Sequence, residues 1–227
     1  MEWAAQYSEH LLFGLSLLES VDMEPSAIAQ ARARLVKAEK ALASFEAATT
    51  LEDAEEAWSD FLLAASTIYS KLEQGSKGHN RSAPWFGKKK KERRDDDLLR
   101  YLHFARNSDE HGIQRVSATT GPNFRGDGRA MRFNEREYVK MQKVNRQSGE
   151  PEGPLIDGVL AGPTLKPVRA TDSRYGDYCD PPEIHLGEAI KYCSFVDGLA
   201  KAAIPYLRQL IEEAQELADS PSEGTTR

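Results

Sequence analysis

The chain has 227 residues, of which 40% are hydrophobic and 29% are charged, and its formal net charge is −6. This length and composition predict a folded protein with one large domain, or one domain that carries an insertion. The negative charge argues against a protein that coats nucleic acid over its whole surface. The only two cysteines, Cys179 and Cys193, form no CxxC motif and no disulfide framework, which favours a reducing cytoplasm.

The N-terminal segment has the features of neither a signal peptide nor a membrane span. Acidic Glu2 and Glu9 stand where a signal peptide would be basic. No apolar run approaches the roughly 20 residues that cross a bilayer. Residues 2–20 instead repeat apolar side chains at spacings of three and four, which predicts a first helix. We therefore expect a cytoplasmic protein with no membrane partner.

Two further segments show the one-sided apolar pattern of packed helices. Pro25 is a natural first helical residue, and Thr49 or Thr50, each with an acid three residues later, begins the next helix. Each apolar stripe is about three heptads long and is interrupted by a turn, which favours short helices in a bundle over a long coiled coil. The stripes consist of Ile28, Ala31, Leu35, Ala38, Leu42 and Phe45, and of Leu51, Ala54, Trp58, Phe61, Ala65, Ile68 and Leu72.

Residues 74–94 are glycine-rich and basic, which predicts an exposed loop. A basic run in this segment would either guide an RNA backbone by counterion release or simply be solvated. The run consists of Lys88, Lys89, Lys90, Lys91, Arg93 and Arg94. Asp95, Asp96 and Asp97 supply a cap for a fourth helix, which Gly112 is placed to end.

The amino-acid composition changes after the fourth helix, where glycine and proline become frequent. Strand-like pieces separated by turns predict a β-rich insertion at 112–186. A last helix at 187–218, with a kink at Pro205, returns to the bundle, and 219–227 is expected to be disordered. The expected fold class is mainly α, with about five helices formed by 1–111 and 187–218. The strand-like pieces are 113–118, 130–133, 138–144 and 164–168.

The end of the fourth predicted helix concentrates polar groups in the sequence RNSDEH, from Arg106 to His111. Arg106 and His111 are about 140° apart around a straight helix and about 7.5 Å apart along it, so they are not stacked on one face. A long guanidinium next to a helix end can still reach the same phosphate as the imidazole. Alternatively, Arg106 and Glu110 form an i,i+4 ion pair, and His111 interacts with the helix dipole.

RNSDEH resembles the Arg-polar-x3-His motif of the HEPN superfamily, whose members are α-helical bundles and include many RNA-cleaving proteins of toxin and antiviral systems. The resemblance implies metal-independent cleavage, in which the ribose 2′-hydroxyl attacks the adjacent phosphate and leaves a 2′,3′-cyclic phosphate. It implies that His111 is the general acid or base, that Arg106 holds the phosphate and that Asn107 orients either the phosphate or the histidine. Glu110 would pair with Arg106 or with a partner's group, because two such motifs usually meet across a homodimer.

Two other functions fit the same sequence. One is a non-catalytic helical interaction protein, such as an antitoxin or a phage-defence subunit. The other is an RNA-binding module that uses the basic run and the insertion without cleaving. An enzyme should need Arg106 and His111, whereas an interaction protein should need Leu35 or Phe61.

Other sites have weaker signals in the sequence. His103 is expected to be a surface or partly buried histidine rather than a second catalytic group. No phosphate-loop, dinucleotide or zinc-protease motif is present, and no His or Cys pair has a recognised ligand spacing. We therefore expect no cofactor and no metal.

Overall fold

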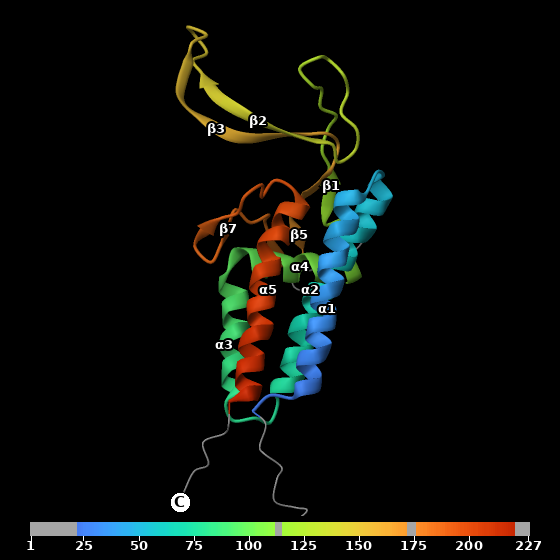
Figure 1. Cartoon of the computed structure of the whole chain (residues 1–227), viewed down its shortest axis with the longest axis vertical. Helices are drawn as coiled ribbons and strands as arrows, with labels where there is room; N and C mark the ends of the chain where they lie inside the picture. Colours follow the sequence, from blue (N-terminus) through green and yellow to red (C-terminus); the bar gives the residue numbers. More distant parts are fainter. Residues whose placement is uncertain (1–21, 112–114, 172–175, 221–227) are drawn as a thin grey trace, which may run out of the picture.

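The computed structural model describes residues 22–111, 115–171 and 176–220, without the side chains of Glu110 and His111. These residues form five helices, with antiparallel strands in the chain between the fourth and the fifth (Figure 1). The predicted helix at 2–20, Gly112 and the tail at 221–227 lie outside the described residues. The helices are α1 (Pro25–Ala47), α2 (Leu51–Ser76), α3 (Ser82–Asp95), α4 (Asp97–His111) and α5 (Val196–Asp219). The strands are β1 (Ser117–Thr119), β2 (Arg136–Val144), β3 (Pro151–Ala161), β4 (Leu165–Pro167), β5 (Ala170–Thr171), β6 (Tyr178–Cys179), β7 (Ile184–His185) and β8 (Glu188–Ala189).

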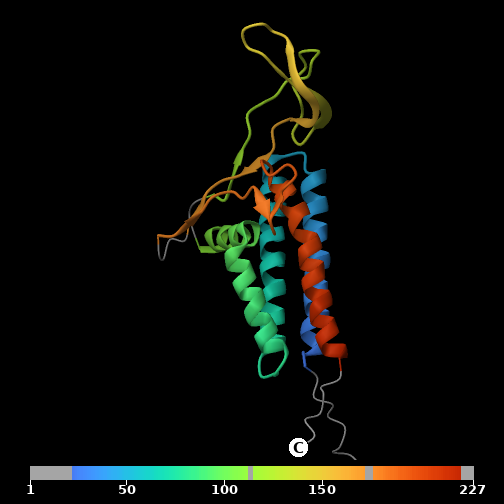
Figure 2. The ribbon, with the colours of Figure 1, turned by 90° about the vertical axis from the view of Figure 1, so that its left-hand side faces the viewer.

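Helices α1 and α2 confirm both predicted apolar stripes. The Thr50 hydroxyl accepts a 3.2 Å hydrogen bond from the Asp53 backbone N–H, which fixes the start of α2. Trp58 and Phe61 stack with their ring centroids 5.5 Å apart in the core. Helices α1, α2, α3 and α5 run along the long axis of the molecule, and α4 lies across it (Figure 2). The stripe residues are buried, except for the partly buried Leu42 and Leu51.

Helix α3 corrects the prediction of an exposed loop at 74–94. Helix α2 extends to Ser76, and only a short turn separates it from α3. Lys, Arg and Glu are good helix formers, and Pro84 lies in the first turn of α3, where proline is tolerated. Phe86 is buried, and the Trp85 indole N–H donates to Glu213 of α5 over 3.0 Å. Long-range packing therefore stabilises a helix whose own sequence has no amphipathic pattern.

The last helix begins later than predicted, at Val196 rather than at residue 187. The preceding residues form the small β7–β8 hairpin and a turn, in which Leu186 and Tyr192 have positive φ angles. Such angles are incompatible with a helix, which explains the late start. Pro205 lies inside α5, as predicted. The helix runs to Asp219, so the first residue of the predicted tail is helical.

The chain between α4 and α5 forms four two-stranded antiparallel sheets in the described residues. Three predicted strands overlap β1, β2 and β4, but residues 130–133 make only an isolated bridge from Ala130 to Phe124. The sequence does not predict strand β3, because its polar and glycine residues interrupt the alternation of apolar and polar side chains that is typical of a strand. Strands β2 and β3 form an exposed arm that projects from the end of the helices (Figures 1 and 2).

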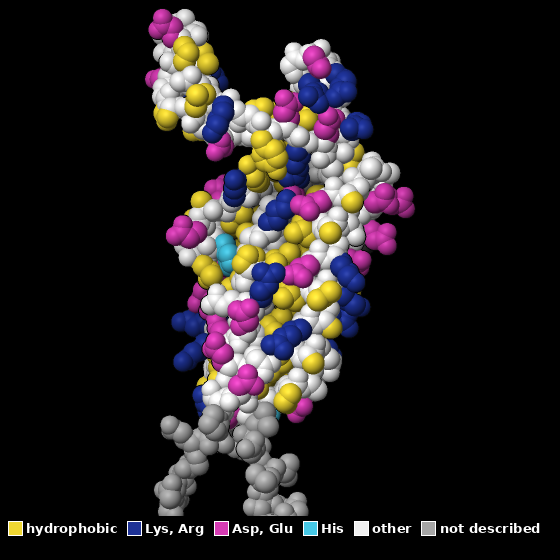
Figure 3. Space-filling view, in the orientation of Figure 1, with side chains coloured by type: hydrophobic (Ala, Val, Ile, Leu, Met, Phe, Trp, Pro, Cys, Tyr) yellow, Lys and Arg dark blue, Asp and Glu magenta, His cyan; other side chains and the backbone are white. Residues whose placement is uncertain are grey.

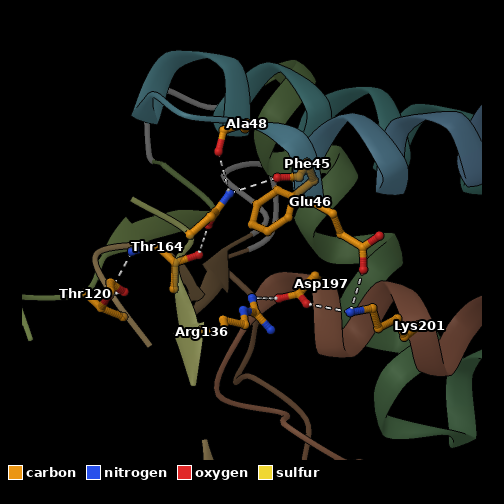
Figure 4. A network of polar contacts seen from close by, with 10 residues as sticks. Phe45, Glu46, Ala48, Thr120, Arg136, Thr164, Asp197 and Lys201 are labelled. Atoms are coloured by element: carbon orange, nitrogen blue, oxygen red, sulfur yellow. Dashed lines mark hydrogen bonds and ion pairs between the residues drawn. The ribbon is translucent and has the colours of Figure 1, made fainter. Parts of the chain in front are cut away.

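Two polar contacts attach this arm to the helices (Figure 4). The Asn134 amide donates to the backbone carbonyls of Phe45 and Ala48, at 2.9 and 3.2 Å, and so caps the C-terminal end of α1. At the start of β2, the Arg136 guanidinium pairs with Asp197 in the first turn of α5 at 2.6 Å. The base of the arm is therefore fixed to both α1 and α5.

Replacing Gly75 with alanine is expected to lower the free energy of unfolding by about 1–3 kcal/mol. A β-carbon at Gly75 would lie 2.4 Å from the Ala27 β-carbon, where α2 passes close to α1. Gly87 of α3 is the matched control, because its β-carbon would have no atom within 4 Å. Gly87→Ala should raise stability by about 0.5–1 kcal/mol. Urea unfolding measures both, and equal stability of the two variants would contradict the close helix contact.

Candidate functional site

The candidate site is built on α4, whose two sides have different roles. One side is buried and includes Leu98, Tyr101 and Ala105. The Tyr101 hydroxyl donates to the Val168 carbonyl over 2.8 Å, so the chain around β4 is attached to this buried side. The helix begins at a cap in which the Asp96 carboxylate accepts the Leu99 backbone N–H over 2.9 Å. These contacts fix the position of α4, and with it the polar end of the helix.

Ser108 lies within the RNSDEH sequence and has a structural contact. Its hydroxyl donates to the Thr171 carbonyl over 2.6 Å and accepts the Thr171 backbone N–H over 3.0 Å. Both backbone groups of one β5 residue are thereby satisfied by a single side chain. The last turns of α4 are therefore attached to the strand region.

Three polar side chains meet on the partly buried side of α4. The Arg106 guanidinium donates to the Asn107 amide oxygen over 3.2 Å. The Asn107 amide nitrogen lies 3.4 Å from His103 Nε2, as i,i+4 neighbours on a helix allow. Arg106 and Asn107 are thus brought together with His103, which the sequence pattern does not single out as a site residue. The i,i+4 spacing of His103 and Asn107 was the signal that could have identified it.

Glu110 and His111 are the last two residues of α4, and their side chains lie outside the described residues. The predicted convergence of His111 with Arg106 therefore stays a prediction. The i,i+4 ion pair of Glu110 with Arg106 also stays a prediction.

His103 also borders a small apolar groove between α2 and α4. The Arg93 guanidinium lies in the same groove, 4.6 Å from the centroid of the Tyr69 ring. Burial raises the pKa of the Tyr69 phenol above its usual range, and its hydroxyl donates to the Tyr206 hydroxyl over 3.2 Å. One guanidinium and one imidazole therefore line a groove whose other side chains are mostly apolar. Its lining residues are Leu62, Ala65, Ser66, Tyr69, Arg93, Leu99, Leu102, His103 and Leu207.

The basic run on α3 divides into two sets of side chains. The first set is engaged within the molecule: Lys89 pairs with Glu213 at 2.9 Å, Lys90 pairs with Glu73 at 3.1 Å, and Arg93 lies over Tyr69. The second set follows a spacing of three residues and is exposed. Lys and Arg side chains project from the side of the molecule where α3 lies (Figure 3). The exposed set consists of Lys88, Lys91 and Arg94.

Likeness to known proteins assigns no function to the candidate site. No family model, curated protein or solved structure matches the chain. Within residues 22–111, 115–171 and 176–220, no cluster of three or more His, Cys, Asp or Glu side chains is arranged to hold a metal ion. No described helix is long and apolar enough to cross a membrane. The candidate site therefore has to be judged on its own side chains.

Proposed function

We propose that this chain is a HEPN-type endoribonuclease whose site lies at the C-terminal end of α4. The observation that carries the proposal is the contact of Arg106 with Asn107, at the place where the motif requires a phosphate-binding pair. The proposal extends to a homodimer formed through α4, which would bring two motifs together. It also extends to a role in a toxin or antiviral system.

The residue types match the chemistry of 2′-hydroxyl attack. The planar guanidinium of Arg106 can donate two parallel hydrogen bonds to a phosphate, and it would stabilise the charge of the pentavalent transition state. The amide oxygen of Asn107 accepts a hydrogen bond from the Arg106 guanidinium and so limits the orientation of that group. His111 would exchange protons with the attacking or the leaving oxygen. His111 is the last residue of α4.

The test is cleavage of single-stranded RNA by the purified chain in EDTA, followed by analysis of the product ends. EDTA suppresses metal-dependent nucleases that contaminate the preparation. We expect 2′,3′-cyclic phosphate ends, and no cut beside a nucleotide whose 2′-hydroxyl has been replaced by hydrogen. Cleavage beside the 2′-deoxy nucleotide would contradict the proposed chemistry. Binding of RNA without any cleavage would favour the non-catalytic RNA-binding module.

The exposed basic set on α3 is expected to bind the RNA backbone. Changing Lys88, Lys91 and Arg94 together to glutamine should weaken RNA binding. It should also reduce the dependence of log K on log salt concentration by about 0.7 for each lost phosphate contact. A titration of labelled RNA at several salt concentrations measures both effects. The matched control changes Arg32, Lys37 and Lys40 on α1, which are also exposed. Equal salt dependence in the two triple variants would show that α3 has no special part in RNA binding.

A further inference from the structure

A cleft separates the β2–β3 arm from the turn before α5. On one side it is lined by Tyr138 and Lys140 of β2, and on the other by Lys191 and Tyr192. This hollow measures about 490 Å³, and an adjoining hollow of about 480 Å³ extends toward His185 and α5. The arm projects over the body of the molecule and leaves an open space below it (Figure 3). The cleft is large enough for a nucleotide or a ligand of similar size.

Tyr192 is held in an unusual backbone conformation at this cleft. Its φ angle is 60°, which is rare for a bulky side chain. The Phe195 backbone N–H donates to the Tyr192 carbonyl over 3.0 Å, and a β-carbon at Gly198 would come within 2.2 Å of that carbonyl oxygen. The glycine thus allows the turn to pack closely on α5. Strained residues that neighbouring contacts hold in place cluster at binding sites.

The fixed turn places the Tyr192 ring against Tyr138 of the arm. The two ring centroids are 6.2 Å apart, and the ring planes are tilted by 55°. Tyr138 remains 68% exposed, so much of its surface is open to the cleft and to solvent. An exposed aromatic side chain next to a second, fixed aromatic side chain offers a stacking surface for a flat ligand.

The charge in the cleft comes from one lysine. Lys140 is paired with Asp157, and Lys201 is paired with Asp197 and Glu46. Lys191 forms no ion pair within the part of the chain that the structure describes, and its ammonium lies 5.1 Å from the centroid of the Tyr192 ring. In the adjoining hollow, the His185 imidazole pairs with Asp96, and Glu188 contributes an acid. A cation beside the tyrosines therefore remains for an anionic group.

We propose that this cleft binds one nucleotide of single-stranded RNA, with the base on Tyr138 and the phosphate at Lys191. Stacking on aromatic side chains combined with a lysine at the backbone is the usual way in which proteins hold unpaired RNA. This inference rests on the proposed function, because it supplies a second contact for the same substrate. The contact between His185 and Asp96 places the adjoining hollow at the N-terminal end of α4. The bound nucleotide therefore lies away from the scissile phosphate near Arg106.

The experiment measures binding of fluorescein-labelled 2′-O-methyl oligouridine by anisotropy, because a probe without a free 2′-hydroxyl stays intact whatever the role of His111. Tyr138→Ala should weaken binding by about 5- to 150-fold, as expected for the loss of one stacked base. Lys191→Gln should weaken it and lower the salt dependence by about 0.7. The controls are Tyr178→Ala and Lys166→Gln, which are also exposed but lie outside the cleft.

Affinities of Tyr138→Ala and Lys191→Gln that equal those of their controls would overturn the inference. Thermal melting of each variant shows whether it is folded, and Lys191→Gln decides the question if Tyr138→Ala is unfolded. The proposed cleavage is tested separately, because anisotropy requires no turnover. If RNA cleavage survives His111→Ala while Tyr138→Ala still weakens binding, the proposed catalytic site is wrong and the nucleotide cleft stands.

Discussion

His111→Ala is expected to slow RNA cleavage by about 10²- to 10⁴-fold, which is the usual contribution of a general acid or base. The protein should remain folded, because the described core residues of α4 all precede His111. Single-turnover cleavage of a labelled RNA by wild-type protein and variant measures the effect. RNA binding should change little, because the phosphate contact assigned to Arg106 is retained.

The matched control for this prediction is His79→Ala. His79 lies in the turn between α2 and α3, outside the candidate site. The control should cleave at the wild-type rate, which would exclude a general effect of removing an imidazole. Wild-type cleavage by His111→Ala would refute the catalytic role, and an equal loss in both variants would show that the effect is not specific to α4.

The helices that the sequence predicted correctly are those in which burial follows a local period. In α1 and α2, spacings of three and four place Ile28 and Phe61 on one buried side, so local sequence is enough. Helix α3 differs, because its many charged residues and Gly87 give no apolar period that would identify Phe86, which is buried against Tyr69 of α2. Its stability depends on contacts with residues far away in the sequence, which no local pattern reveals.

In the candidate site, too, contacts between sequence neighbours are predictable and contacts between distant residues are not. Arg106 and Asn107 are adjacent in the sequence, and their contact needs only the helix that the pattern predicts. Tyr138 and Tyr192 meet only because β2 pairs with β3 and because Gly198 lets the turn before α5 pack closely. The sequence pattern instead predicts Tyr192 on the last helix. A cleft formed between an arm and a turn depends on tertiary structure, and the sequence carried no signal for it.

Asp197 supports both the arm and the cleft, and its replacement is expected to have the largest effect on stability. Its side chain is 1% exposed and accepts hydrogen bonds from Arg136 at 2.6 Å and from Lys201 at 3.1 Å. The Arg136 side chain, which is 15% exposed, also lies over the Phe195 ring at 4.9 Å. The carboxylate therefore joins the start of β2 to the first turn of α5 (Figure 4).

Asp197→Ala should lower the free energy of unfolding by about 3–5 kcal/mol, because it leaves a largely buried guanidinium without its carboxylate. Urea unfolding measures the change. Asp157→Ala is the matched control, since Asp157 pairs with Lys140 but is 70% exposed. An exposed ion pair contributes only about 0–1 kcal/mol, so this control should stay close to wild type.

The double variant Arg136→Ala/Asp197→Ala separates the ion pair from simple loss of packing. Once both charges are removed, no buried charge lacks a partner, so the double variant should lose clearly less stability than the sum of the two single variants. Additive losses would mean that the two side chains stabilise the fold independently, and that the pair does not attach the arm. Because the arm carries Tyr138, Asp197→Ala should also weaken oligouridine binding, whereas Asp157→Ala, which frees Lys140 in the cleft, should not weaken it.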